Sequence, residues 1–541
     1  MGLAFWAGLL VLVGGAVLLG ADRAATGATV LGTGLVIAGA VVTLVAWRLK
    51  QRAAATEPAR SDQVPRAAQE LQAVVREQWL HETQARSLGD PDPMPVCWRL
   101  SDPAMMDHDE HIASTGLRCA GRSDRITALT DQFRTFRRRR LVITGSPGSG
   151  KTTLAVQLLL QLLEGWQPGE PVPVLFSLAS WDPHTQPRVQ DWLADQLAQA
   201  YPKLRAFGSD TAQKLADQGR LLPVLDGLDE IPPERRGEVI ARLNASLHPD
   251  SGLIVTSRTV EYTETVHTGV VLTAAAVIQL DPLTTSEAAS YLEDRLPRRP
   301  GESWLAVLTA LRGGTAGALA EVVASPLGLW LLRAVCIEGR RDPQSLIDPG
   351  HYPDAAAIQH HLLEELIPAA FRSRPPLPTR HHDPDQVRRW LTTLASQLRD
   401  TKTRDWQRWQ LARHVLTPWQ IGLAIGLMIG VRVGLVGGLV LGVGLQVGWV
   451  GGLVGGLALG LALGLASGLA MAKTRWSAFI VAWLWLAVRR RLPLRLMGFL
   501  RDAHRLGLLR SVGPVYQFRH AALQDHLAHD HVSDHDCSVH R

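Results

Sequence analysis

The residues with the clearest chemical potential lie in one glycine-rich stretch, 141–153, which reads LVITGSPGSGKTT. It matches the G-x-x-x-x-G-K-[ST] pattern, in which glycines let backbone N–H groups turn toward a phosphate. Lys151 is expected to reach the β- and γ-phosphates, and the Thr152 hydroxyl to hold Mg²⁺. The residues expected to contact nucleotide phosphates are Gly145, Ser146, Pro147, Gly148, Ser149, Gly150, Lys151, Thr152 and Thr153.

A second stretch, LLPVLDGLDEI at 221–231, supplies carboxylates. Its apolar run ends at Asp226, which we expect to share the Mg²⁺ with Thr152, and Asp229 and Glu230 follow as groups that could orient or activate water. Arg258 follows the apolar run 253–257 and is placed to sense a γ-phosphate. The simpler alternatives are an acidic loop after a strand and a surface arginine.

The elements around these residues alternate between strands and helices. β-favouring residues precede the glycine-rich loop and an apolar helical run, 154–163, follows it; further strands are expected at 172–178, 221–225 and 253–257, with helices at 189–200 and 241–247. Such alternation predicts an α/β domain with a parallel sheet and helices on both faces. Ligands then bind at the carboxyl ends of the strands.

The rest of the polar sequence is predicted to be mainly helical. Helices are expected across 284–371, where Ser325-Pro326-Leu327 opens one of them, and at 386–398, 476–488, 501–509 and 521–527, with one short strand at 515–518. The end of the chain carries several irregularly spaced histidines, for which a metal cluster and a solvated tail are both open.

Composition limits the partners. The net charge of +6 is spread over scattered arginines, so we expect no nucleic-acid binding. The four cysteines stand far apart, which favours a reducing compartment over a disulfide framework or a cysteine zinc site.

Three uncharged or nearly uncharged stretches predict membrane spans. Residues 1–21 and 24–47 are long enough to cross a bilayer, and the basic cluster after position 47 favours a hairpin with a cytoplasmic end. A cleaved signal peptide is the rival reading, but no basic residue starts the chain. Residues 419–472 contain a single charge, Arg432, and glycines at every fourth position, which favours two close-packed spans over a low-complexity loop.

These observations divide the chain into eight parts. We expect an N-terminal transmembrane hairpin (1–47), a linker and helix (48–111), a nucleotide-binding domain (112–275), a helical domain (276–371), the first helices of a further region (372–418), the glycine-rich transmembrane block (419–472), the continuation of that region (473–530) and a tail (531–541). We expect a multi-pass cell-membrane protein whose nucleotide-binding domain is cytoplasmic.

Taken together, the chain resembles the NACHT family of signal-transduction ATPases, in a membrane-attached bacterial form. The resemblance rests on GSPGSGKTT, LDGLDE, LIVTSR, SPLGL at 325–329 and YQFRHAALQDHLA at 516–528. It implies a P-loop NTPase domain followed by helical and winged-helix domains, with ATP or ADP and Mg²⁺ as ligands. It also implies that Pro326 packs near the adenine and that His520, in the winged-helix domain, touches the β-phosphate of ADP.

The function expected from these features is a membrane-anchored switch. ADP would hold the chain closed through His520, whereas ATP would open it, permit homo-oligomer formation and be slowly hydrolysed. The activating signal or protein partner cannot be named from the sequence. An ATP-driven transporter is the alternative, although the chain lacks an L-S-G-G-Q motif, and a passive scaffold is a third reading.

Overall fold

The computed structural model describes residues 63–85, 94, 96–373 apart from 115, 118 and 249, then 383–401, 404, 406, 475–489, 491–512 and 515–529, with isolated positions between 423 and 461. The predicted hairpin at 1–47, the tail at 531–541 and, apart from those isolated positions, the glycine-rich block lie outside the described residues. Within the described part, no helix is long and apolar enough to cross a membrane.

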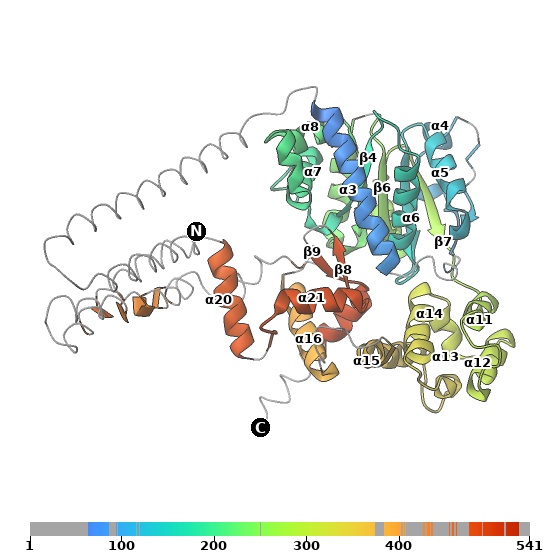
Figure 1. The fold of residues 1–541 in the computed structure, drawn as a ribbon. Coiled ribbons are helices and arrows are strands. Elements are labelled where there is room, and N and C mark those ends of the chain that lie inside the picture. The colour runs from blue at the N-terminus through green and yellow to red at the C-terminus, as the bar shows by residue number, and fades with distance from the viewer. Residues whose placement is uncertain are drawn as a thin grey trace, which may run out of the picture.

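The N-terminal half of the described chain builds an α/β domain around one mixed sheet (Figure 1). Five strands run parallel, and the two short strands β1 and β2 add antiparallel to the β7 edge. The strands are β1 (Cys97–Leu100), β2 (Gly121–Arg122), β3 (Arg140–Gly145), β4 (Val172–Ser177), β5 (Leu221–Asp226), β6 (Leu253–Arg258) and β7 (Ala275–Leu280).

The order of the sheet, β2-β1-β7-β3-β6-β5-β4, places β3 between β7 and β6. In this register Gly145 at the end of β3 pairs with Arg258 at the end of β6. Parallel strands have their carboxyl ends at the same edge, so the loop after β3, Asp226 and Arg258 lie at that edge together. The parallel strands are buried almost throughout, as expected for a sheet covered by helices on its faces.

Helices cover the sheet and fill one continuous hydrophobic core from Val64 to Leu280. They are α3 (Gln63–Ala85), α4 (Asp109–Ile112), α5 (Ile126–Thr135), α6 (Lys151–Glu164), α7 (Val189–Ala200), α8 (Thr211–Asp217), α9 (Pro233–Ser246) and α10 (Thr259–His267). The helix α3 buries Leu71, Val75 and Trp79 and crosses the sheet beside α6 (Figure 1).

Two features of this domain differ from the sequence-based expectation. The sheet is mixed rather than parallel, because β1 pairs antiparallel with β7 and the edge strand β2 pairs antiparallel with β1. Both α3 and β1 also lie before residue 112, where the nucleotide-binding domain was expected to begin. The stretch expected as a linker and helix therefore supplies part of the sheet and core of this domain.

A helical domain follows the last strand. It consists of α11 (Thr285–Glu293), α12 (Glu302–Arg312), α13 (Ala318–Val323), α14 (Pro326–Leu332) with a π-helical continuation (Arg333–Glu338), and α15 (Ala355–Ser373). Ser325 caps α14 by accepting a hydrogen bond from the Gly328 N–H, and Pro326 occupies the first helical position, where its missing N–H costs nothing.

The remaining elements form what we call the C-terminal unit, the described residues of 383–406 and 475–529. It contains α16 (Pro384–Asp400), α20 (Arg475–Val488), α21 (Leu496–Arg505), the antiparallel hairpin of β8 (Leu509–Val512) and β9 (Val515–Phe518), and a last helix over 521–529. The helix expected at 501–509 ends at Arg505, and β8 was not predicted. The helix expected to be buried at 476–488 buries Ala482 and Leu486 but exposes Val488.

The C-terminal unit is assembled from both sides of the glycine-rich block. Trp406 and Tyr516 exchange two backbone hydrogen bonds of 2.8 and 3.2 Å, so a segment before the block extends the hairpin that follows it. The unit also shares its hydrophobic core with the helical domain. The described chain therefore has two cores, one under the α/β sheet and one common to everything after it.

Candidate functional site

The glycine-rich loop lies between β3 and α6 and has the backbone geometry that its sequence predicts. Gly148 and Gly150 adopt φ values of +74° and +92°, which side-chain-bearing residues rarely accept. The helix α6 begins at Lys151, so the first N–H groups of this helix have no partner within it and suit an anion. The loop and helix start thus form a ready phosphate cradle.

Lys151 lies folded over this loop. Its Nζ donates hydrogen bonds to the carbonyl oxygens of Gly145 at 3.0 Å and Ser146 at 2.9 Å. Burial lowers the pKa of Lys151 from its usual value, against the opposing charge of Asp229. The ammonium is therefore kept at the loop by carbonyl groups that a phosphate can replace as partners.

Thr152 and Asp226 meet at the carboxyl edge of the sheet. The Thr152 hydroxyl donates to the Asp226 carboxylate at 2.8 Å, and the Thr256 hydroxyl donates to the same carboxylate at 2.6 Å. Thr256 in turn accepts from the Gly227 N–H at 3.0 Å, which fixes the turn after β5. These hard oxygen atoms are the ligand type that Mg²⁺ prefers, so the residues present fit a magnesium ion.

Asp229 and Arg258 form a second pair beside the first. Arg258 Nε lies 2.9 Å from one Asp229 oxygen, and the Arg258 backbone N–H donates to the other at 3.2 Å. Burial raises the pKa of Asp229 from its usual value, although the charges of Lys151 and Arg258 act in the opposite direction. Arg258 thus engages both oxygens of the Asp229 carboxylate.

Glu230 meets a residue from outside the α/β domain. Arg404 of the C-terminal unit lies 3.6 Å from the Glu230 carboxylate and makes a bidentate contact with Asp525, at 2.7 and 3.3 Å. Burial raises the pKa of Glu230 to about 7, although Arg404 favours the charged form. A carboxyl group with that pKa suits proton transfer near neutral pH.

A second arginine of the C-terminal unit reaches Asp226. Arg510, on β8, places Nη2 3.6 Å from the Asp226 carboxylate, and both side chains are mostly buried at 15% and 12% exposure. Its Nε donates to Gln517 on β9, so the hairpin itself positions the guanidinium. Each arginine of this pair therefore faces one of the carboxylates expected to serve metal or water.

These residues line one cleft of about 460 Å³ between the α/β domain, the helical domain and the C-terminal unit. Pro326 and Val96 also line it, and each has a side-chain carbon within 3.8 Å of the position that a Cβ on residue 150 would occupy. His520 lies across the cleft at the start of the last helix, with its ring centroid 4.6 Å from that of Trp330. The cleft thus combines apolar side chains, which suit a flat base, with the loop and charged groups, which suit phosphates.

The structure brings together most of the residues expected from the sequence. Lining the cleft are Pro147, Gly148, Gly150, Lys151, Thr152, Thr153, Asp226, Asp229, Glu230, Arg258, Pro326 and His520. Gly145 and Ser146 take part through their carbonyl groups, and Ser149 is buried in the loop.

Sequence reasoning missed Arg404, Arg510, Thr256 and Trp330. Thr256 lies inside the predicted strand 253–257, but the sequence analysis singled out only Arg258, which follows that strand. The arginines carry no local motif, because only the fold of the C-terminal unit brings them to the cleft.

Comparisons with known proteins agree with this geometry. Residues 139–299 match the family model of the NACHT domain. The match runs from the start of β3 through the loop, the acidic strand end and Arg258, and it ends shortly after α11. It supports a P-loop NTPase domain that binds nucleotide.

The other comparisons add little. No curated protein matches the chain. The crystal structure of Cdc6p from Pyrobaculum aerophilum is similar at 12% identity over 73% of this chain and 88% of that chain, but the TM-score is only 0.21.

Proposed function

We propose that the protein is a membrane-anchored, nucleotide-dependent signalling switch that binds ADP or ATP with Mg²⁺ and slowly hydrolyses ATP. The NACHT match at residues 139–299 and the cleft around Lys151 support nucleotide binding. In the proposal, ADP accompanies a closed arrangement, and ATP accompanies an open one that associates with further copies of the chain.

The proposed switch between two states rests on one pair of contacts. Arg404 and Arg510 of the C-terminal unit lie against Glu230 and Asp226 of the α/β domain. The carboxylates that hydrolysis requires are thus the same groups that hold the C-terminal unit in place. A nucleotide that draws these carboxylates to Mg²⁺ and water weakens the closing contacts, so the two states bind nucleotide differently.

The residues of the cleft divide the chemistry of hydrolysis among them. Lys151 and the N–H groups of the loop balance the phosphate charge. Thr152 and Asp226 would hold Mg²⁺, which when bound neutralises charge on the β- and γ-phosphates. Glu230 accepts a proton from the attacking water, while Arg258, held by Asp229, faces the terminal phosphate. We propose that His520 contacts the β-phosphate of ADP.

Membrane attachment is proposed from the predicted spans alone, and the structure describes the chain from shortly after the predicted hairpin. The helix α3 begins at Gln63, soon after the predicted hairpin, and packs on the α/β domain. Its buried Glu82 lies 2.9 Å from His504 on α21. The segment nearest the predicted anchor therefore touches both the nucleotide-binding domain and the C-terminal unit.

The test combines retained nucleotide, its release rate and particle size. Protein purified gently in detergent should retain ADP, and a non-hydrolysable ATP analogue should increase its mass in light scattering. Arg510→Ala should release ADP several-fold faster, because one closing contact is lost, with Arg505→Ala on α21 as the control. Arg505 is exposed and has an ion pair with Asp502 on its own helix. An ADP release rate unchanged by Arg510→Ala would contradict the proposed closing contact.

A further inference from the structure

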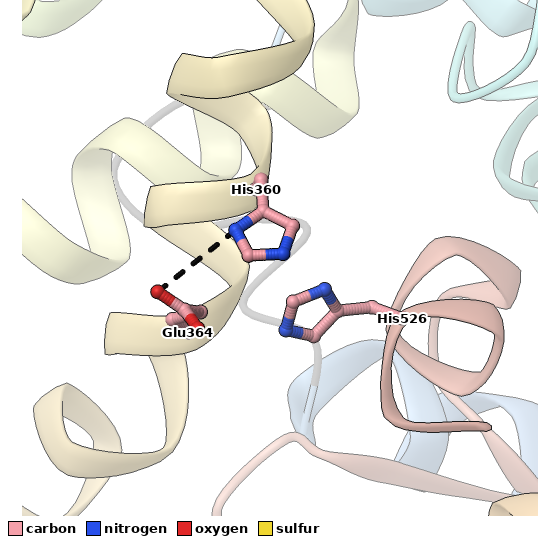
Figure 2. A group of neighbouring side chains, drawn as sticks. All are labelled: His360, Glu364 and His526. Atoms are coloured by element: carbon pink, nitrogen blue, oxygen red, sulfur yellow. Dashed lines mark ion pairs between the residues drawn. The ribbon is translucent and has the colours of Figure 1, made fainter. Parts of the chain in front are cut away.

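A group of potential metal ligands lies outside the cleft, where the helical domain meets the last helix. His360 and Glu364 stand on α15, and His526 stands on the helix over 521–529 (Figure 2). The first two lie four positions apart and therefore share one face of α15. His526 approaches this face from a different element and points toward both of them (Figure 2).

The distances within this group suit a shared ion. One ligand atom from each of the three residues lies within 4.8 Å of the others. His360 Nδ1 is 3.9 Å from a Glu364 oxygen, and the two imidazole rings are 4.6 Å apart at 78°. Ligand atoms around tetrahedral Zn²⁺ are about 3.3–3.6 Å apart, so small side-chain rotations bring all three into range.

We propose that His360, Glu364 and His526 form a Zn²⁺ site. Two imidazoles and one carboxylate are a ligand set that zinc uses with water in the fourth position. Arg388 on α16 lies 3.6 Å from Glu364 Oε1, whereas the other oxygen, Oε2, faces His360. The guanidinium thus orients the carboxylate in the way that outer partners orient metal ligands.

Zinc at this position would clamp the last helix onto α15. That helix also carries Asp525, which holds Arg404 beside Glu230. Zinc should therefore strengthen the closed arrangement, a consequence that rests on the proposed switch, whereas the metal site itself does not.

The sequence hides this site, because the glycine-rich block and most of the C-terminal unit separate His526 from His360 and Glu364 along the chain. The histidines after position 529 offer a competing place for zinc, so the test must distinguish the two locations.

Zinc affinity of the full-length protein is measured first, by competition with a chromogenic chelator and without nucleotide. We expect one tight Zn²⁺ per chain and a loss of affinity of about tenfold or more in His360→Ala, in His526→Ala and in Glu364→Gln. His529→Ala is the matched control, since His529 is exposed on the same helix as His526. His360 is exposed, so its variant should fold even if His526→Ala does not.

Co²⁺ provides a second readout, because tetrahedral coordination gives intense visible absorption that octahedral surface binding lacks. We expect this absorption in the parent and in His529→Ala and its loss in His360→Ala. Equal zinc affinity and equal Co²⁺ spectra in the parent and His360→Ala would overturn the site. If zinc binds as expected but leaves the ADP release rate unchanged, the site stands and its link to the switch is refuted.

Discussion

Lys151 shows how a single charged group can be prepared for a ligand by its own loop. The carbonyl groups of Gly145 and Ser146 hold its ammonium where the phosphates are expected. The G-x-x-x-x-G-K-[ST] pattern was sufficient to predict this position, because the pattern encodes the local backbone that places the lysine.

The Lys151→Ala substitution should weaken nucleotide binding by about tenfold or more, since a charge-assisted hydrogen bond contributes about 1.5–3 kcal/mol. Calorimetry with ADP measures the change, and Lys214→Ala on α8 is the control, because Lys214 pairs with Asp210 on the surface. Equal affinity in the parent and Lys151→Ala would refute the phosphate-loop assignment.

Glu230 should give ATP turnover a pH dependence near neutrality. A carboxyl group with its pKa raised to about 7 is largely protonated below that pH and becomes a proton acceptor above it. Turnover should therefore rise as the pH increases through about 7. Glu230→Gln should still bind nucleotide but should lose most ATP turnover and the increase of turnover with pH. If its turnover and pH dependence equal those of the parent, Asp229 or another group accepts the proton.

At the scale of elements, the sequence predicted what is locally encoded. The strands at 172–177, 221–226 and 253–258 and helix α7 agree closely with the expected ranges, because long apolar runs and turn residues mark them. The short strands β1 and β2 were missed, since four and two residues carry no usable periodicity. β8 was missed for the same reason, and with it the position of Arg510.

The contact between the phosphate loop and α14 gives an element-level prediction. The Leu327 N–H donates to the Gly148 carbonyl at 3.1 Å, and a Cβ at position 148 would lie 2.8 Å from the Leu327 Cβ. Gly148→Ala should therefore displace α14 from the loop and reduce nucleotide affinity by about tenfold, as overpacking typically costs about 1–3 kcal/mol.

The matched control is Gly169→Ala. Gly169 also has a positive φ, +103°, but has nothing within 4 Å of its Cβ position. It reproduces the backbone strain without the clash. If both variants bind nucleotide as the parent does, the contact with α14 does not shape the site.

At the scale of the whole molecule, the C-terminal unit restricts how the glycine-rich block can cross a membrane. Residues on both sides of the block meet at Trp406 and Tyr516, and Arg404 and Arg510 both reach the same cleft. If the block spans the membrane, it must then cross an even number of times. Two spans in the block meet this condition and, with the predicted hairpin, make up the four spans that we predict.

The topology prediction can be tested with single cysteines at Ser61, Gln446 or Ser533 in a cysteine-free background. A membrane-impermeant thiol reagent applied to intact cells should label only Gln446→Cys, because the other two positions are expected inside. Permeabilised cells, in which all three should react, provide the control. Labelling of Ser533→Cys in intact cells would overturn the four-span arrangement.

The split of the C-terminal unit also governs the order in which a newly made chain can fold. Arg404 cannot form its ion pair until Asp525, 121 residues later, has been synthesised. Synthesis of that stretch takes roughly 6–24 s at about 5–20 residues per second. The α/β domain, whose core ends at Leu280, emerges from the ribosome well before that partner. Each nascent chain therefore passes through an interval in which Glu230 and Asp226 are not yet covered, and cellular ATP can reach the cleft before its closing half exists.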